Sequence, residues 1–96
     1  MHIKQEDDST RGSFYVEENG KRVAELAYTW RSKDVLSIDH TEVDESLEGK
    51  GVGSALVDHI VSIARETGIK MKIYCPFAKK VFERHKDYND VLATDH

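Results

Sequence analysis

A glycine-rich loop is the part of this 96-residue sequence whose spacing most clearly suggests chemistry. Residues 49–53 are Gly-Lys-Gly-Val-Gly, and they come just before an amphipathic run. Successive backbone N–H groups at the start of a helix bind anions, and missing β-carbons let a phosphate approach the backbone closely. Lys50 adds a flexible positive charge and Ser54 a hydroxyl donor. The loop therefore predicts a phosphate site, and the alternative is a glycine-rich turn that only reverses the chain.

The spacing of this loop excludes two common kinds of phosphate loop. A Walker loop needs four residues between its first glycine and Gly-Lys-Ser/Thr, whereas Lys50 directly follows Gly49 and precedes Gly51. A dinucleotide fingerprint is G-x-G-x-x-G at the first strand-to-helix turn, whereas here the run is G-x-G-x-G and follows several expected strands. Neither a Walker nor a Rossmann site is expected.

The residues before the loop predict antiparallel strands. Alternating apolar residues over residues 13–30, interrupted by Asn19-Gly20, predict a β-hairpin, because Asn-Gly tolerates the positive φ angles of a type I′ turn. Residues 35–43 predict a further strand, with Leu36, Ile38 and His40 on one face. Residues 1–12 predict a frayed lead-in or a first edge strand.

The residues after the loop predict a helix, a strand and a second helix. Apolar residues recur every three or four positions from Val52 to Ile63, and Gly68 follows as a left-handed C-terminal residue would. Residues 70–75 alternate as a strand, and about 77–85 form a short helix. The order βββ(β)αβα predicts an α+β fold, a mostly antiparallel sheet with one β-α-β crossover.

The composition predicts one small domain over residues 1–96. Of these residues 39% are hydrophobic, which suits one core and an open cleft. Cys75 is the only cysteine, so no internal disulfide is expected, and no signal peptide or long apolar run is evident. We expect a cytoplasmic protein. The sequence has fourteen basic and eighteen acidic residues, and the basic residues are not clustered into an arm. We therefore expect neither a nucleic acid nor a membrane as a partner.

Residues 48–53, Glu-Gly-Lys-Gly-Val-Gly, resemble motif A of the GNAT superfamily of N-acetyltransferases, which is Gln/Arg-x-x-Gly-x-Gly/Ala at the start of a helix. Residues 40–43, 75–77 and 87–91 resemble in particular the small stand-alone N-acetyltransferase-domain proteins. The resemblance implies a truncated GNAT-like fold that uses acetyl-CoA and transfers acetyl to a small-molecule amine or a protein amine. Glu48 departs from the usual Gln or Arg, which implies weaker attraction of phosphate.

The resemblance also implies a set of cofactor-binding residues. Strand residues 41–43 would contact the pantetheine, and backbone groups of residues 48–54 would hold the pyrophosphate. Apart from the resemblance, Lys79 and Lys80 near the start of the last expected helix could reach the CoA phosphates, and the alternative for them is a solvated pair of surface charges. The complete set is Thr41, Glu42, Val43, Glu48, Gly49, Lys50, Gly51, Val52, Gly53, Ser54, Lys79 and Lys80. No metal site is expected, because the histidines lack metal-ligand spacing with Cys75 or the carboxylates.

Three side chains are candidates for catalysis. His40 and Glu42 share a face of a regular strand, and either could accept the proton of an amine. The alternatives are a structural histidine and a solvated carboxylate. Cys75 could attack the thioester through its thiolate to give an acetyl-cysteine, as the resemblance to the small proteins implies. The alternative for Cys75 is a small buried apolar side chain.

The proton donor to the departing thiolate is not assigned by the sequence. Phe82 stands where many family members have a tyrosine, and Tyr74 or Tyr88 could substitute. Two other functions stay open at this point. One is a non-catalytic acyl-CoA-binding or sensing module, and the other is a protein-interaction domain whose glycine loop is merely a turn.

Overall fold

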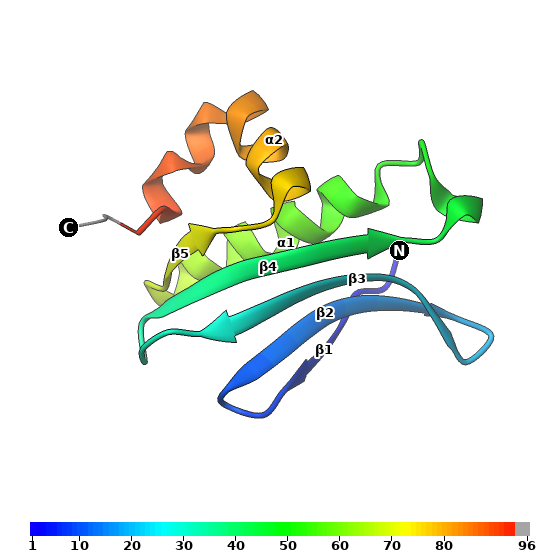
Figure 1. The fold of residues 1–96 in the computed structure, drawn as a ribbon, viewed down its shortest axis with the longest axis horizontal. Coiled ribbons are helices and arrows are strands. Elements are labelled where there is room, and N and C mark those ends of the chain that lie inside the picture. Colours follow the sequence, from blue (N-terminus) through cyan, green and yellow to red (C-terminus); the bar gives the residue numbers. More distant parts are fainter. Residues whose placement is uncertain (94–96) are drawn as a thin grey trace.

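The computed structural model describes residues 1–93 and contains a five-stranded sheet with helices packed on it (Figure 1). The strands lie in chain order, antiparallel from β1 to β4, with β5 parallel to β4. The predicted α+β class and the crossover are confirmed. The elements are β1 (Lys4–Asp7), β2 (Arg11–Glu18), β3 (Lys21–Trp30), β4 (Val35–Val43), η1 (Glu45–Leu47), α1 (Val52–Thr67), β5 (Lys70–Ile73), α2 (Pro76–Arg84) and η2 (Lys86–Val91).

The hairpin of β2 and β3 forms as the sequence predicts. Asn19 and Gly20 connect the two strands with φ angles of 54° and 79°, which is the pair of positive values that a type I′ turn requires. Of the two alternatives for residues 1–12, the edge strand is correct, because β1 pairs with β2 at the edge of the sheet.

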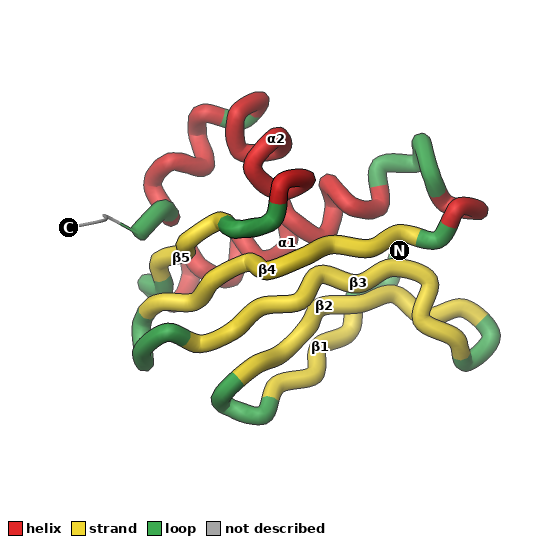
Figure 2. The backbone as a smooth tube through the Cα atoms, viewed as in Figure 1, coloured by secondary structure: helices red, strands yellow, loops and turns green. Residues whose placement is uncertain are grey.

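Helix α1 contributes its apolar stripe to the core. It packs across one face of the sheet (Figure 2). Leu26 and Ile38 of the sheet and Leu56 and Ile60 of the helix belong to the buried core. The helix ends at Gly68 with a φ of 81°, as predicted. No helix within residues 1–93 is long and apolar enough to cross a membrane.

An irregularity in β4 changes which face its last residues occupy. Ile38 pairs with Tyr28 and His40 pairs with Ala27, so Asp39 is an extra residue opposite the junction of Ala27 and Tyr28. A β-bulge of this kind reverses the alternation beyond it. The prediction that Leu36, Ile38 and His40 share one face is therefore wrong.

Strands β4 and β5 separate beyond their last pair, Ile38 with Ile73. The backbone N–H groups of Tyr74 and Cys75 both donate to the Ile38 carbonyl, at 2.9 and 3.1 Å, and the chain then enters α2. The strand β5 therefore ends two residues before the predicted limit at Cys75. Because β4 continues to Val43, its residues 39–43 have no partner strand on this side within the described chain (Figure 1).

Candidate functional site

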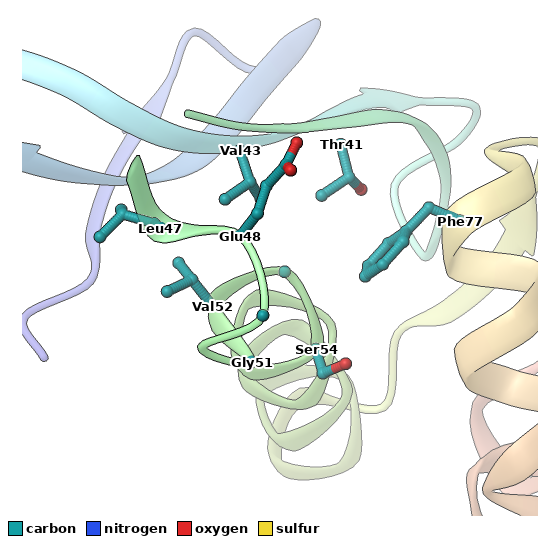
Figure 3. Close-up of a pocket in the computed structure, with 10 residues that line it drawn as sticks. Thr41, Val43, Leu47, Glu48, Gly51, Val52, Ser54 and Phe77 are labelled. Carbon is teal, nitrogen blue, oxygen red and sulfur yellow. The ribbon is translucent and has the colours of Figure 1, made fainter. Parts of the chain in front are cut away.

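A pocket of about 320 Å³ lies where β4, the glycine loop, α1 and α2 meet (Figure 3). The loop follows η1, whose first turn is capped by the carboxylate of Asp44. The pocket brings together residues of the predicted pantetheine strand, 41–43, and of the predicted pyrophosphate loop, 48–54. Its lining residues are Thr41, Val43, Leu47, Glu48, Gly49, Gly51, Val52, Gly53, Ser54 and Phe77.

At two positions of the loop the backbone conformation favours glycine over any other residue. Gly49 and Gly51 have φ angles of 79° and 76°, in the left-handed region that side chains disfavour. A β-carbon built on either residue would meet no atom within 4 Å. The space beside both glycines is therefore open, and packing within the chain does not explain them.

The N-terminus of α1 is not capped by a side chain. Gly51 is the N-cap residue, its first turn contains no acidic residue, and the first helical hydrogen bond there runs from the Ala55 N–H to the Gly51 carbonyl at 3.0 Å. The preceding N–H groups have no intrahelical partner, and the helix dipole makes this end positive. The side chain of Ser54 lies beside them (Figure 3). These donors suit an anion such as a phosphate.

Gly53 is explained by packing and not by conformation. Its φ is not positive, but a β-carbon there would lie 2.7 Å from Cζ of Phe77 and 2.9 Å from Cε2. The ring of Phe77 thus occupies the space that a side chain at position 53 would need. The sequence alone attributed this glycine to phosphate approach, and the structure adds a second reason.

The charged residues of the predicted cofactor set are not gathered around the pocket. Among the described lining residues, Glu48 is the only charged one, and its side chain extends toward β4 (Figure 3). Lys50 belongs to the loop but does not line the pocket. Lys79 lines a separate groove together with Phe82, and Lys80 is exposed on α2. Roles of these lysines stay predictions.

His40 and Glu42 lie on the opposite face of the sheet from the pocket. Their predicted common face is confirmed, since His40 pairs with Ala27 and Glu42 with Glu25, and His40 Nε2 lies 3.8 Å from Glu42 Oε1. His40 lines a groove of about 600 Å³ on this outer face. Catalysis by either residue therefore requires an acceptor that arrives from the outer face.

Cys75 lies directly behind the pocket. It is 3% exposed, and its thiol donates to Thr41 Oγ1 with a sulfur-to-oxygen distance of 3.6 Å. Thr41 itself lines the pocket, whereas Cys75 does not. A nucleophilic role would require side chains around the thiol to move.

The tyrosines considered as proton donors lie outside the pocket. The hydroxyl of Tyr88 donates to Asp58 at 2.9 Å, and burial, reinforced by this bond, raises the pKa of Tyr88 to about 12. Tyr74 is 51% exposed, with its ring centroid 5.4 Å from the guanidinium carbon of Arg31. Neither residue lines the pocket, so neither is positioned by the fold as a donor there.

Two lining residues were not in the predicted set. Leu47 precedes the glycine loop and carries no chemical signal in the sequence. Phe77, for which the sequence predicted no binding role, is 40% exposed and forms a wall of the pocket. The sequence did offer one signal for this role, because Phe77 lies at the start of the helix that follows β5, the strand that pairs with β4.

A family model, a curated relative and solved structures all indicate the same protein family for this chain. The family model described as GCN5-related N-acetyl-transferase matches residues 13–91. Mouse protein NATD1 is 29% identical over 79 residues, which span 81% of this chain and 72% of NATD1. The solution structure of a GCN5-like protein from Staphylococcus aureus is 32% identical, covers 99% of this chain and 90% of its own, and has a TM-score of 0.73. An aminoglycoside N-acetyltransferase, AAC(6')-Iy, solved in complex with CoA, shares the fold at 13% identity over 86% of this chain and 88% of its own, with a TM-score of 0.63.

Proposed function

This chain belongs to the GCN5-related N-acetyltransferase family, and from that premise we propose that it transfers the acetyl group of acetyl-CoA to an amine. The observation that carries the proposal is the uncapped N-terminus of α1, which opens into a pocket beside an unpaired edge of β4. The acceptor is an amine of a small molecule or of a protein. A cytoplasmic location and the absence of nucleic-acid and membrane partners stay predictions.

The residues of the pocket fit the two ends of the cofactor. Open space beside Gly49 and Gly51 leaves room for a pyrophosphate against the backbone N–H groups of the loop and helix. The unpaired backbone of residues 39–43 offers hydrogen bonds to the amides of a pantetheine chain, as a neighbouring strand would. When bound, acetyl-CoA supplies an activated thioester. The protein contributes by fixing this thioester at the gap between β4 and β5.

The acceptor reaches this gap from the outer face of the sheet. His40 lies there beside the unpaired edge of β4, with Glu42 next to it. In the proposed reaction His40 accepts the amine proton, directly or through water, and Glu42 stabilises the protonated imidazole. The bulge at Asp39 is what turns His40 toward the acceptor side.

Two routes for the acetyl group are chemically distinct. In direct transfer the amine attacks the thioester, whereas in the covalent route the Cys75 thiolate attacks first and releases CoA. Direct transfer needs no rearrangement of the protein core. The covalent route requires Cys75 to leave its buried position and its bond to Thr41. Direct transfer is therefore the favoured route.

A second function is a non-catalytic acyl-CoA-binding or sensing module. Two residues favour it. Glu48 places a carboxylate in the lining of the proposed phosphate pocket, and Phe82, which cannot donate a proton, stands where many family members have a tyrosine. This function predicts binding of CoA without transfer. A protein-interaction domain, the remaining alternative, predicts no affinity for CoA.

Acetyl transfer by the purified protein tests the proposal. The protein is incubated with acetyl-CoA and a panel of small amines and peptides, and released thiol and acetylated products are measured. Transfer that depends on His40 and persists in Cys75→Ala supports the direct route. An acetylated protein in intact-mass spectra, together with loss of transfer in Cys75→Ala, supports the covalent route. Binding of acetyl-CoA without transfer to any acceptor would leave the binding module as the better account.

A further inference from the structure

Two hydroxyl side chains line the pocket, and they come from different elements. Ser54 is in the first turn of α1, beside the backbone N–H groups that suit a phosphate. Thr41 is on β4, across the pocket from Ser54 (Figure 3). No other described residue of the lining has a hydroxyl or a thiol. A bound acyl-CoA would therefore meet the two hydroxyls with different parts of the molecule.

Thr41 lies on the side of the pocket that adjoins the gap between β4 and β5. The other lining residue of β4 is Val43, whose Cγ2 is 3.5 Å from the point where a β-carbon of Gly53 would be, so Val43 lies at the phosphate end. Thr41 is two residues back, about 7 Å along the strand toward Ile38, where β4 and β5 separate. Because the thioester belongs at this gap, Thr41 is the pocket hydroxyl closest to the proposed position of the sulfur.

The orientation of the Thr41 hydroxyl is set by Cys75. The thiol of Cys75 donates to Thr41 Oγ1 across 3.6 Å, and the Cys75 N–H donates to the Ile38 carbonyl at 3.1 Å, so this contact lies at the gap. A hydroxyl has one donor and two acceptor positions, and the thiol uses an acceptor position. The hydroxyl hydrogen of Thr41 is not engaged in this bond. It is therefore available to a group bound in the pocket.

We propose that the Thr41 hydroxyl donates a hydrogen bond to the CoA sulfur and stabilises the departing thiolate. This inference rests on the proposed function and adds a catalytic residue to it. Neither Tyr74 nor Tyr88 lines the pocket, and the Phe82 side chain has no donor. A hydrogen bond to an ionised acceptor is about twice as strong as one between neutral groups. The bond from Thr41 strengthens as the sulfur gains charge, which is the condition for accelerating the transfer.

Thr41 keeps its own proton throughout the transfer. As the bond from the amine nitrogen to the acetyl carbon forms, the bond from that carbon to sulfur breaks, and its electron pair stays on sulfur. His40 takes the amine proton, and the Thr41 hydroxyl holds the thiolate. After the products leave, the protonated His40 releases its proton to water and the thiolate takes one from water. Neither residue is changed after one turnover.

Calorimetric titrations with CoA and with desulfo-CoA, which has no thiol, test this hydrogen bond without any transfer. A donor to the thiolate lowers the pKa of the bound CoA thiol, so the affinity for CoA rises as the pH passes through that pKa. In the unaltered protein the affinity for CoA relative to desulfo-CoA should rise about fivefold between about pH 7 and about pH 9.5. In Thr41→Val, which keeps the shape and loses the hydroxyl, it should rise less than about twofold.

Two further variants separate the hydroxyl from the structure around it. Thr41→Ser keeps a hydroxyl and should retain most of the rise. Ser54→Ala removes the other pocket hydroxyl, so it should weaken both ligands alike and leave the rise unchanged. In the transfer assay, Thr41→Val should lower kcat about a hundredfold and change KM for acetyl-CoA by less than about threefold. Thr41→Ser should restore most of the rate.

The outcomes separate this inference from the proposed function. A pH-dependent gain for CoA that folded Thr41→Val loses and Ser54→Ala retains supports the inference. If the unaltered protein binds CoA without such a gain, or if folded Thr41→Val shows an equal gain, the inference is overturned and the proposed function stands. Failure of the unaltered protein to bind either ligand overturns both.

Discussion

The two ends of helix α1 are bounded by the same kind of residue but are completed differently. Gly51 before the helix and Gly68 after it have φ angles of 76° and 81°. At the C-terminal end the Gly68 N–H donates to the Ala64 carbonyl at 2.9 Å, and Arg65 in the last turn binds Asp90. At the N-terminal end no side chain caps the helix, and the space beside the glycine is open.

We propose that this difference separates a structural glycine, Gly68, from a binding glycine, Gly51. The C-terminal end uses its left-handed residue to satisfy its own backbone, which is the usual role of a glycine there. The N-terminal end leaves donors without a partner in the chain, which costs stability unless water or a ligand satisfies them. We infer that the N-terminal end is kept open for an anion.

The largest expected effect comes from the same substitution at both ends. Gly51→Val and Gly68→Val each place a branched side chain in the left-handed region and should cost about 1–2 kcal/mol or more of stability. Only Gly51→Val also fills the space in which we propose that the phosphate binds. It should lower acetyl-CoA affinity by about 3 kcal/mol, which is roughly a hundredfold. Calorimetry on both folded variants measures this, and an equal loss of affinity at the two positions would contradict the comparison.

A smaller effect is expected from the carboxylate in the pocket. Glu48→Gln removes a negative charge from the lining of the proposed phosphate site and should raise CoA affinity roughly fivefold at low salt. The gain should shrink as salt screens the repulsion. Glu66→Gln, near the other end of α1, is the matched control and should change affinity little. Weaker binding in Glu48→Gln would show that the carboxylate is a ligand-binding group.

Lys50 should contribute less than either of these changes. Its side chain lies outside the pocket lining, so Lys50→Ala should weaken CoA binding by only about threefold and reduce its dependence on salt. Lys80→Ala, on α2, provides the comparison. Titrations at two salt concentrations measure the difference, and a loss as large as that of Gly51→Val would place the lysine in the site.

The smallest expected effect is at the C-terminal end and concerns stability alone. The hydrogen bond from Arg65 lowers the pKa of Asp90, while partial desolvation opposes the shift. A carboxyl whose pKa is lower when folded stabilises the protein above its unfolded pKa and loses that contribution as pH falls through its folded pKa. Asp90→Asn should therefore lower the melting temperature slightly at neutral pH, and not at strongly acidic pH. A pH-independent difference, or any loss of CoA affinity, would contradict this assignment.

Local signals in the sequence were sufficient for most of the fold. Asn19-Gly20 and Gly68 adopt the backbone angles that their residue types favour, and the period of α1 follows from its apolar stripe. Motif spacing similarly singled out the loop of residues 49–53, which lines the pocket and has positive φ angles at Gly49 and Gly51, while its binding of phosphate stays a prediction. These features depend on residues that are close in the sequence.

The parts that could not be predicted depend on contacts between distant residues. The bulge at Asp39 is set by how β4 pairs with β3, and it moved His40 to the face opposite Ile38. The wall formed by Phe77 depends on its contact with Gly53, which lies in a different helix. Neither contact has a signature in local composition.

Amide chemical-shift changes on titration with acetyl-CoA test the central claim most directly, since they report on both ends of α1 in one experiment. The account predicts that the largest changes fall on residues 49–54, with further changes at Thr41, Val43 and Phe77. Gly68 and its neighbours should change little. Absence of changes at residues 49–54 at millimolar cofactor, or changes as large around Gly68, would contradict the claim that the N-terminal end of α1 is the phosphate site.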